Sequence, residues 1–122
     1  MLDLSSSETQ LFIRSSQVDT VDDSELDTID FGVVALDADG VVLRYNLYES
    51  RLARLDRNQV LGRNFFTDVA PCTRCDEFEG RFRHVVATGD RVQFEFLFDF
   101  RFGAQKVAVE IISIPGGDRY YL

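Results

Sequence analysis

The sequence predicts a single α+β domain: an antiparallel sheet of five to six strands with helices packed against it. The chain has 122 residues, which is enough to bury one hydrophobic core. Phenylalanine occupies every second position from 94 to 102, the period of a strand with one aromatic face. Apolar residues recur at helical spacing in 76–88, between an earlier pair of strand-like segments and three later ones.

The first two strands are predicted to form a hairpin. Residues 31–37 (FGVVALD) are rich in β-branched side chains, and residues 41–46 (VVLRYN) repeat that character. Between them, residues 37–40 (DADG) have the composition of a tight turn.

Helices are expected in the middle of the chain. Residues 47–55 are typical of a short, irregular helix. Asp56 is a suitable N-cap for a second helix, with Gln59 at its third position and Gly62 at its end. A longer helix is expected over 76–88, because its apolar side chains fall on one face.

The C-terminal part of the chain is expected to be a meander of three strands. The aromatic strand covers 93–102, and a turn is expected at Gly103–Ala104. Alternation resumes over 106–114, and the turn sequence PGGD at 115–118 leads to a last, short strand at 119–122.

Residues 1–28 are predicted to form an N-terminal helical cap on a core of residues 29–122. Short helices are possible around 11–13 and from 24 onward. Of the net charge of −8, most belongs to residues 1–30, which carry eight acids and one base. No basic stripe is present, so nucleic acid is not an expected partner. No apolar run is long enough for a membrane span and no signal peptide is evident, so we expect a cytoplasmic monomer.

Both cysteines of the chain lie in the stretch VAPCTRC, residues 69–75. A redox dithiol is one interpretation, but the βαβ context typical of that motif is missing. A metal site is not predicted, because His84 is the only other nitrogen or sulfur ligand candidate and zinc needs about four ligands. Two buried structural cysteines are the plainest alternative.

Three stretches of this sequence resemble the photoactive yellow protein family: LDADGVVLRYNLYESRL, VLGRNFFTDVAPCTRCDEFEGRF and FEFLFDF. The resemblance extends from about Leu26 to Lys106, and its most specific part is the NFF-x-DVAPCT core. It implies a PAS fold and a blue-light photoreceptor, with p-coumaric acid held as a thioester. The cysteine that follows Ala-Pro in this chain is Cys72, so the resemblance assigns the thioester to Cys72.

The resemblance also implies how the bound phenolate is held. A tyrosine hydroxyl and a protonated glutamic acid four residues later correspond to Tyr45 and Glu49. Light isomerises the chromophore, Glu49 passes its proton to the phenolate, and the carboxylate left behind drives partial unfolding that signals to an unidentified downstream protein. The remaining pocket residues implied are Phe65, Val69, Ala70, Pro71, Phe98, Phe100 and Phe102.

Some positions depart from the family pattern. Ala53 replaces a supporting threonine, Leu55 replaces an arginine over the pocket, and Phe102 replaces a methionine. Arg51 or Arg54 are candidates to take over from the missing arginine. Two other functions stay open: a PAS interaction module without chromophore, in which Tyr45 only packs and Glu49 is solvated, and a thiol–disulfide protein using Cys72 and Cys75. In the favoured interpretation, the photoreceptor, the chain catalyses no turnover reaction.

Overall fold

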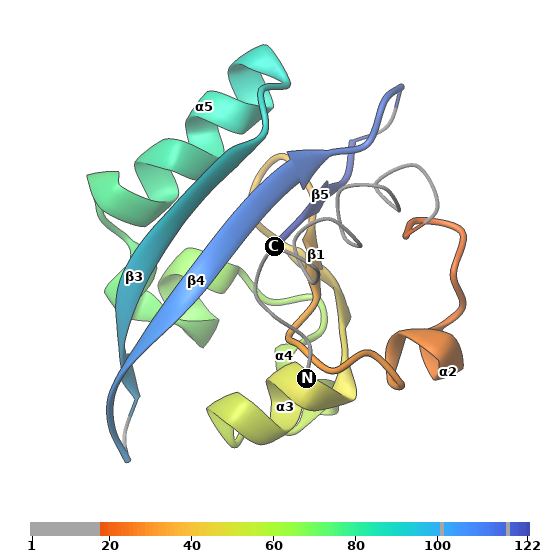
Figure 1. The fold of residues 1–122 in the computed structure, drawn as a ribbon, viewed down its shortest axis with the longest axis vertical. Coiled ribbons are helices and arrows are strands. Elements are labelled where there is room, and N and C mark those ends of the chain that lie inside the picture. Colours follow the sequence, from red (N-terminus) through yellow and green to blue (C-terminus); the bar gives the residue numbers. More distant parts are fainter. Residues whose placement is uncertain (1–17, 101, 117) are drawn as a thin grey trace.

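The structure is a computed structural model that describes residues 18–100, 102–116 and 118–122; the possible helix around residues 11–13 lies outside this part. It confirms an antiparallel five-stranded sheet with helices, in the strand order β2-β1-β5-β4-β3 (Figure 1). The strands are β1 Val34–Leu36, β2 Val42–Tyr45, β3 Val92–Phe100, β4 Gly103–Ser113 and β5 Tyr120–Tyr121.

The β1–β2 hairpin has the predicted turn. The Asp37 carboxylate accepts hydrogen bonds from the backbone N–H groups of Asp39 and Val41, each at 2.9 Å, and Gly40 takes a positive φ of 90°. Strand β1 begins later than expected, because the residues before it leave the ladder: the Asn46 side chain accepts from Val33 N–H and donates to the Phe31 carbonyl, both at 2.9 Å.

The helices are short. They are α2 Asp23–Leu26, α3 Leu47–Ala53, α4 Arg57–Val60 and α5 Arg81–Thr88. The single helix expected over 76–88 is instead a π-helical turn, Asp76–Gly80, followed by α5. No side chain caps its start at Cys75, and the Gly80 N–H reaches the Cys75 carbonyl five residues back, which widens the turn. Gly89, at φ 78°, ends α5 as predicted.

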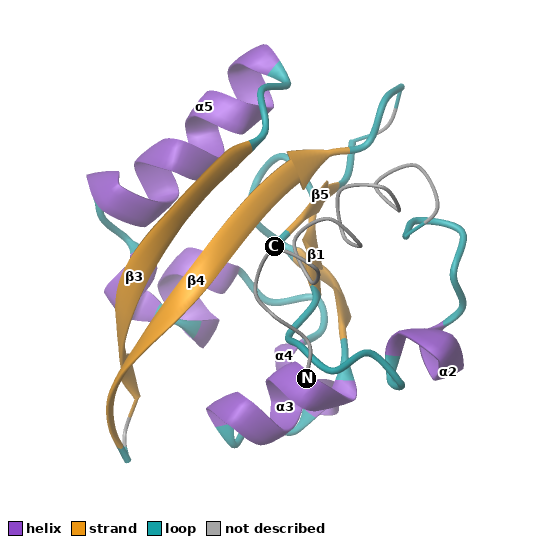
Figure 2. Ribbon diagram, viewed as in Figure 1, coloured by secondary structure: helices purple, strands orange, loops and turns teal. Residues whose placement is uncertain are grey.

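Strands β3 and β4 form the long hairpin that dominates the sheet (Figure 2). Their ladder runs from Val92↔Ile111 to Phe100↔Gly103, so the expected turn at Gly103–Ala104 is wrong: β4 already begins at Gly103. The alternating aromatic residues favour a paired strand up to Phe100.

Alternation along the strands gives the sheet two buried faces. Val34 faces a large aromatic core beneath the helices, whereas its neighbours Val33 and Ala35 belong to a smaller cluster on the opposite face. Val18 and Leu26, from the described part of the N-terminal segment, complete that second cluster. The predicted division into a cap of 1–28 and a core of 29–122 stays a proposal, and residues 18–28 pack on the outer face as a cap would.

Candidate functional site

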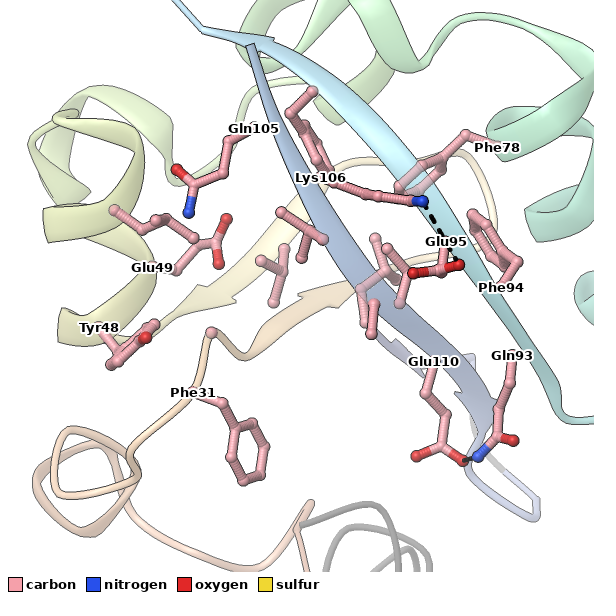
Figure 3. Close-up of a pocket in the computed structure, with 18 of the residues that line it drawn as sticks. Phe31, Tyr48, Glu49, Phe78, Gln93, Phe94, Glu95, Gln105, Lys106 and Glu110 are labelled. Atoms are coloured by element: carbon pink, nitrogen blue, oxygen red, sulfur yellow. Dashed lines mark hydrogen bonds and ion pairs between the residues drawn. The ribbon is translucent and has the colours of Figure 1, made fainter. Parts of the chain in front are cut away.

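A cavity of about 760 Å³ lies between the β3–β4 hairpin, α3 and the residues that lead into β1 (Figure 3). Its inner wall is aromatic and comes from two parts of the chain: strand β3, and the two π-helical turns Phe65–Val69 and Asp76–Gly80. The aromatic residues of this wall are Phe65, Phe78, Phe94, Phe98 and Phe100. Glu49 reaches the cavity from α3, and Figure 3 shows its carboxyl close to the Gln105 side chain, on the opposite side of the view from Phe78 and Phe94.

Glu49 is held in place by the start of its own helix. Asn46 caps α3, and its side-chain oxygen accepts from the Glu49 backbone N–H at 3.1 Å. The carboxyl end lies against Gly32, so closely that a Cβ on Gly32 would come within 1.8 Å of Oε2. Although the carboxyl reaches the cavity, protein atoms surround it, and this burial raises the pKa of Glu49 to about 7. No hydrogen bond to this carboxyl occurs in the described part of the chain.

Tyr45, the last residue of β2, is buried on the same face. Burial raises the pKa of its hydroxyl, and the Glu49 carboxyl raises it further, so the two groups are near neighbours. Its hydroxyl also lacks a hydrogen-bond partner among the residues described. With Glu49 protonated, the site presents two neighbouring O–H donors without an acceptor in the described residues, an arrangement that suits an oxyanion.

The cysteine loop packs against the same aromatic core. Cys72 lies in a 3₁₀ turn, Pro71–Thr73, and is half-buried. Thr73 fixes the turn by donating its hydroxyl to the Ala70 carbonyl at 2.6 Å. Cys75 is a second free thiol, whose Sγ lies 3.7 Å from the Cys72 carbonyl. Burial raises the pKa of Cys75, which disfavours the thiolate that disulfide exchange requires.

The structure distributes the predicted site residues over three environments. Four line the cavity: Glu49, Phe65, Phe98 and Phe100. Four pack against the same aromatic core without lining the cavity: Tyr45, Val69, Ala70 and Cys72. Pro71 and Phe102 are exposed.

Arg54 lies beside Phe102 at the end of α3. Its guanidinium carbon is 4.0 Å from the centroid of the Phe102 ring, which in turn stacks on Phe100. Arg54 is able to reach this position because it ends α3 in the left-handed conformation, at φ 57°. Leu55 packs inward against the core instead. Of the two arginines considered as substitutes, Arg54 thus contacts a predicted pocket residue.

Sequence reasoning did not single out Gly32, Phe31, Gln105 or Glu110 as site residues, although all four line the cavity. Gly32 and Phe31 precede β1, and they approach Glu49 only because Asn46 draws this segment toward α3. Gln105 and Glu110 lie on β4, whose register against β1 depends on pairing through β5. A local motif carries no signal for such contacts.

Comparison with known proteins identifies the class of protein first. A family model described as "PAS fold" matches residues 26–119. The photoactive yellow protein domain of the sensor histidine kinase Ppr from Rhodospirillum centenum has a similar structure, with a TM-score of 0.83 at 38% sequence identity. The match covers 88% of this chain and 95% of that one.

Named relatives then give the family. A photoactive yellow protein from Rhodothalassium salexigens is 42% identical over 101 residues, which is 82% of this chain and 81% of that protein. One from Cereibacter sphaeroides is 34% identical over 75% of each chain. The chain belongs to the photoactive yellow protein family of PAS-fold photoreceptors. Its relatives are sensors rather than enzymes. In the part of the chain described, no helix has the length and apolar character needed to cross a membrane.

The residues present fit the aromatic, phenol-bearing chromophore that the family implies. The cavity has an aromatic wall, and two groups with raised pKa, the Glu49 carboxyl and the neighbouring Tyr45 hydroxyl, are able to donate hydrogen bonds beside it. A half-buried free thiol packs against the same core.

Proposed function

We propose that the chain is a blue-light photoreceptor that carries p-coumaric acid as a thioester on Cys72. Family membership and the Ala-Pro-Cys sequence of the loop support this proposal. The observation that carries it is the pair formed by Tyr45 and Glu49. Tyr45 keeps its proton at neutral pH, and Glu49, with its pKa raised to about 7, keeps its proton at neutral pH in part and fully below it; neither has a hydrogen-bond partner in the described residues.

When bound, p-coumaric acid supplies absorption of blue light and a double bond that isomerises. Attachment, hydrogen bonding and proton release are assigned to the chain's own residues. The Cys72 sulfur would hold the group, and the hydroxyls of Tyr45 and of protonated Glu49 would donate hydrogen bonds to its phenolate oxygen, which would offset the cost of burying an anion. Loss of this geometry lets Glu49 give up its proton, and the carboxylate that remains is buried without a cationic partner in the described residues.

The N-terminal segment is joined directly to the helix that carries Glu49. Asn46, which caps α3, donates to the Leu26 carbonyl at 3.2 Å. Asp27 accepts from the Leu47 backbone N–H at 2.8 Å. A displacement at the start of α3 therefore strains the contacts that hold residues 26–27. We propose that residues 1–28 loosen as a result and that this change signals to a downstream protein in the cytoplasm, without a turnover reaction.

Reconstitution tests the proposal. The purified chain is treated with an activated p-coumaric acid derivative, and its visible spectrum is recorded before and after blue light. Cys72→Ser is the test variant, and Cys75→Ser is the matched control, because it removes the second thiol of the same loop. The expected result is a visible band that blue light bleaches and darkness restores, absent in Cys72→Ser and retained in Cys75→Ser.

A colourless protein whose Cys72 still reacts with a thiol reagent would contradict the proposal and favour a PAS interaction module without chromophore. Insulin reduction that is lost in Cys75→Ser would favour a thiol–disulfide protein instead.

A further inference from the structure

Both cysteines of the chain lie in one tight turn and are free thiols. Cys72 belongs to the 3₁₀ turn Pro71–Thr73, and Cys75 stands directly before the π-helical turn Asp76–Gly80. The backbone folds back between the two cysteines, because the Cys75 N–H donates to the Thr73 carbonyl at 2.8 Å. The turn therefore keeps two nucleophilic side chains within one short loop.

The two residues are close enough for a disulfide. Cys75 Sγ lies 3.7 Å from the carbonyl oxygen of Cys72. Since bond lengths place a carbonyl oxygen about 2.4 Å from the Cα of its own residue, this sulfur lies at most about 6 Å from the Cys72 Cα. Disulfides join residues whose Cα atoms are roughly 4.4–6.8 Å apart. The spacing Cys-x-x-Cys is also the one that redox-active cysteine pairs use.

Both thiols are accessible to a small reagent, and Cys75 suits the second step of disulfide exchange. Each thiol is partly exposed and partly packed against the aromatic core. Burial raises the pKa of Cys75, and the nearby Glu77 carboxylate raises it further. Cys75 is therefore a weak attacking group toward an outside molecule. It is better placed to react once the target sulfur is already held in the same turn.

We propose that Cys72 and Cys75 are a modification site for a low-molecular-weight disulfide of the glutathione class, which converts them to a reversible intramolecular disulfide. This disulfide decides whether the chain can receive its chromophore, because a thioester on Cys72 requires the free thiol. The control of attachment rests on the proposed function, whereas formation of the disulfide does not.

Two exchange steps form the bond. The Cys72 thiolate attacks one sulfur of the small disulfide, whose S–S bond breaks, and one half leaves as a thiolate. The Cys75 thiolate then attacks the Cys72 sulfur of this mixed disulfide and expels the other half. The two protein thiols are oxidised, and the small disulfide is reduced to two thiols, which take up the two protons that the cysteines release. An excess of a reducing thiol reverses both steps.

The surroundings favour this site over the other uses of a cysteine pair. A metal site lacks support, because the described residues contain no group of three or more His, Cys, Asp or Glu side chains that could hold an ion. A purely structural role does not require sulfur in side chains that stay partly exposed. The chain has no third cysteine, so a loss of two hydrogen atoms within one molecule identifies the Cys72–Cys75 disulfide.

The test uses the full chain before chromophore is attached. The reduced protein is incubated at mildly alkaline pH with excess oxidised dithiothreitol. This cyclic disulfide oxidises paired thiols but leaves a single thiol free, because its mixed disulfide closes back to the ring. Intact-mass spectrometry after acid quenching reports the thiol state, and uptake of an activated p-coumaric acid derivative reports attachment. Cys75→Ser is the matched control, since it keeps the Cys72 thiol and removes its partner.

We expect the wild-type chain to lose two hydrogen atoms and to take up at least about tenfold less chromophore than the reduced chain, with full recovery after reduction. Cys75→Ser should keep its mass and take up chromophore within about twofold of the reduced chain. Circular dichroism checks that Cys75→Ser folds, and Cys75→Ala replaces it if it does not. The mass measurement on the wild-type chain needs neither variant.

A wild-type chain that keeps both thiols would overturn the proposal, as would a disulfide between two molecules, visible as a dimer on a non-reducing gel. An oxidised chain that takes up chromophore as well as the reduced one would overturn the control of attachment. If the reduced chain takes up no chromophore, the proposed function fails and the control of attachment fails with it. The loss of two hydrogen atoms still decides whether the disulfide forms.

Discussion

Two neighbouring residues of β2 face opposite sides of the sheet and have opposite surroundings. Arg44, on the outer face, donates to the carbonyls of Val18 and Val21, to Asp23 at 3.1 Å and to the Tyr121 hydroxyl at 3.0 Å. Tyr45, on the inner face, has no partner for its hydroxyl in the described residues. Strand β2 thus takes part in a saturated polar network on one face, whereas on the other face its Tyr45 lies near Glu49 of α3, and neither side chain has a hydrogen-bond partner in the described residues.

The outer network continues beyond Arg44. The Tyr121 hydroxyl donates to Asp19 at 3.0 Å, and Arg119 donates to the same carboxylate at 2.8 Å. The Arg119 hydrogen bond lowers the pKa of Asp19, so this carboxylate stays charged over a wide pH range. These contacts fix residues 18–23 to the sheet in one arrangement.

The inner face instead carries a side chain, Glu49, that can change its charge near neutral pH. Glu49 has a pKa raised to about 7 by burial, and its carboxyl touches Gly32 without a hydrogen bond in the described part. A group whose pKa lies near the ambient pH gains or loses its proton at little cost. The outer face of the sheet therefore holds residues 18–23 in one arrangement, whereas the inner face carries a carboxyl, Glu49, whose charge changes near neutral pH.

The largest expected effect is on the anchor. Arg44→Met keeps the aliphatic bulk but leaves the carbonyls of Val18 and Val21 without their donor, and we expect the free energy of unfolding to fall by about 3 kcal/mol. Urea unfolding at pH 7 measures this loss. Hydrogen exchange should show faster opening of residues 18–23 than of β3.

Arg74→Met is the matched control, because Arg74 is exposed and its side chain has no contact of this kind in the described residues. It is expected to change stability by less than about 0.5 kcal/mol. Equal effects of the two substitutions would show that the outer network does not anchor the segment.

The second effect is a pH dependence from the inner face. The pKa of Glu49 is about 7 in the folded chain against 4.5 as the reference value, so the folded state holds the proton more tightly. The stabilising contribution is complete below the unfolded value and is lost as pH rises through the folded one. We expect about 2–3 kcal/mol of stability to be lost between pH 4.5 and 7.

Glu49→Gln should remove this part of the pH dependence, since an amide does not titrate. Glu95→Gln, which alters an exposed carboxylate, should leave it intact. Urea unfolding at half-unit pH steps provides the comparison. A wild-type curve that is flat or rises over this window would contradict a raised pKa at Glu49.

The sequence predicted best what local patterns control. The phenylalanine alternation located β3 to within two residues, and turn residues located the β1–β2 hairpin. The resemblance to photoactive yellow protein brought Tyr45 and Glu49 forward as a pair, and the structure places both on one face, where the Glu49 carboxyl raises the pKa of Tyr45.

Non-local contacts account for what the sequence did not predict. The end of the β3–β4 ladder at Phe100↔Gly103 and the π-helical turn at Asp76–Gly80 depend on how far the strand pairing and the core packing extend, which no residue type signals. Burial of Glu49 depends on Gly32, which Asn46 positions through its bonds to Phe31 and Val33. A charged residue in a polar helix gives no hint of that neighbour.

The smallest expected effect tests the contact between Gly32 and Glu49. In Gly32→Ala the new Cβ would lie 1.8 Å from the Glu49 Oε2 position, so the flexible carboxyl must move away. We expect a loss of about 1 kcal/mol in stability, and a midpoint of the Glu49 titration lower than about 7, because the displaced carboxyl gains access to water. Carboxyl-detected NMR titration measures the midpoint.

Gly80→Ala adds the same methyl group where the nearest atom is 3.5 Å away, an ordinary contact, and it should leave the Glu49 midpoint unchanged. The two glycines then separate a general effect of an added side chain from a specific one. If Gly32→Ala lowers stability but not the midpoint, the raised pKa arises from the aromatic wall alone. If it lowers both, the absence of a side chain at residue 32 is what lets the Glu49 carboxyl stay buried and keeps its pKa raised. The outer face has no equivalent requirement, because the Arg44 network there is fully hydrogen-bonded.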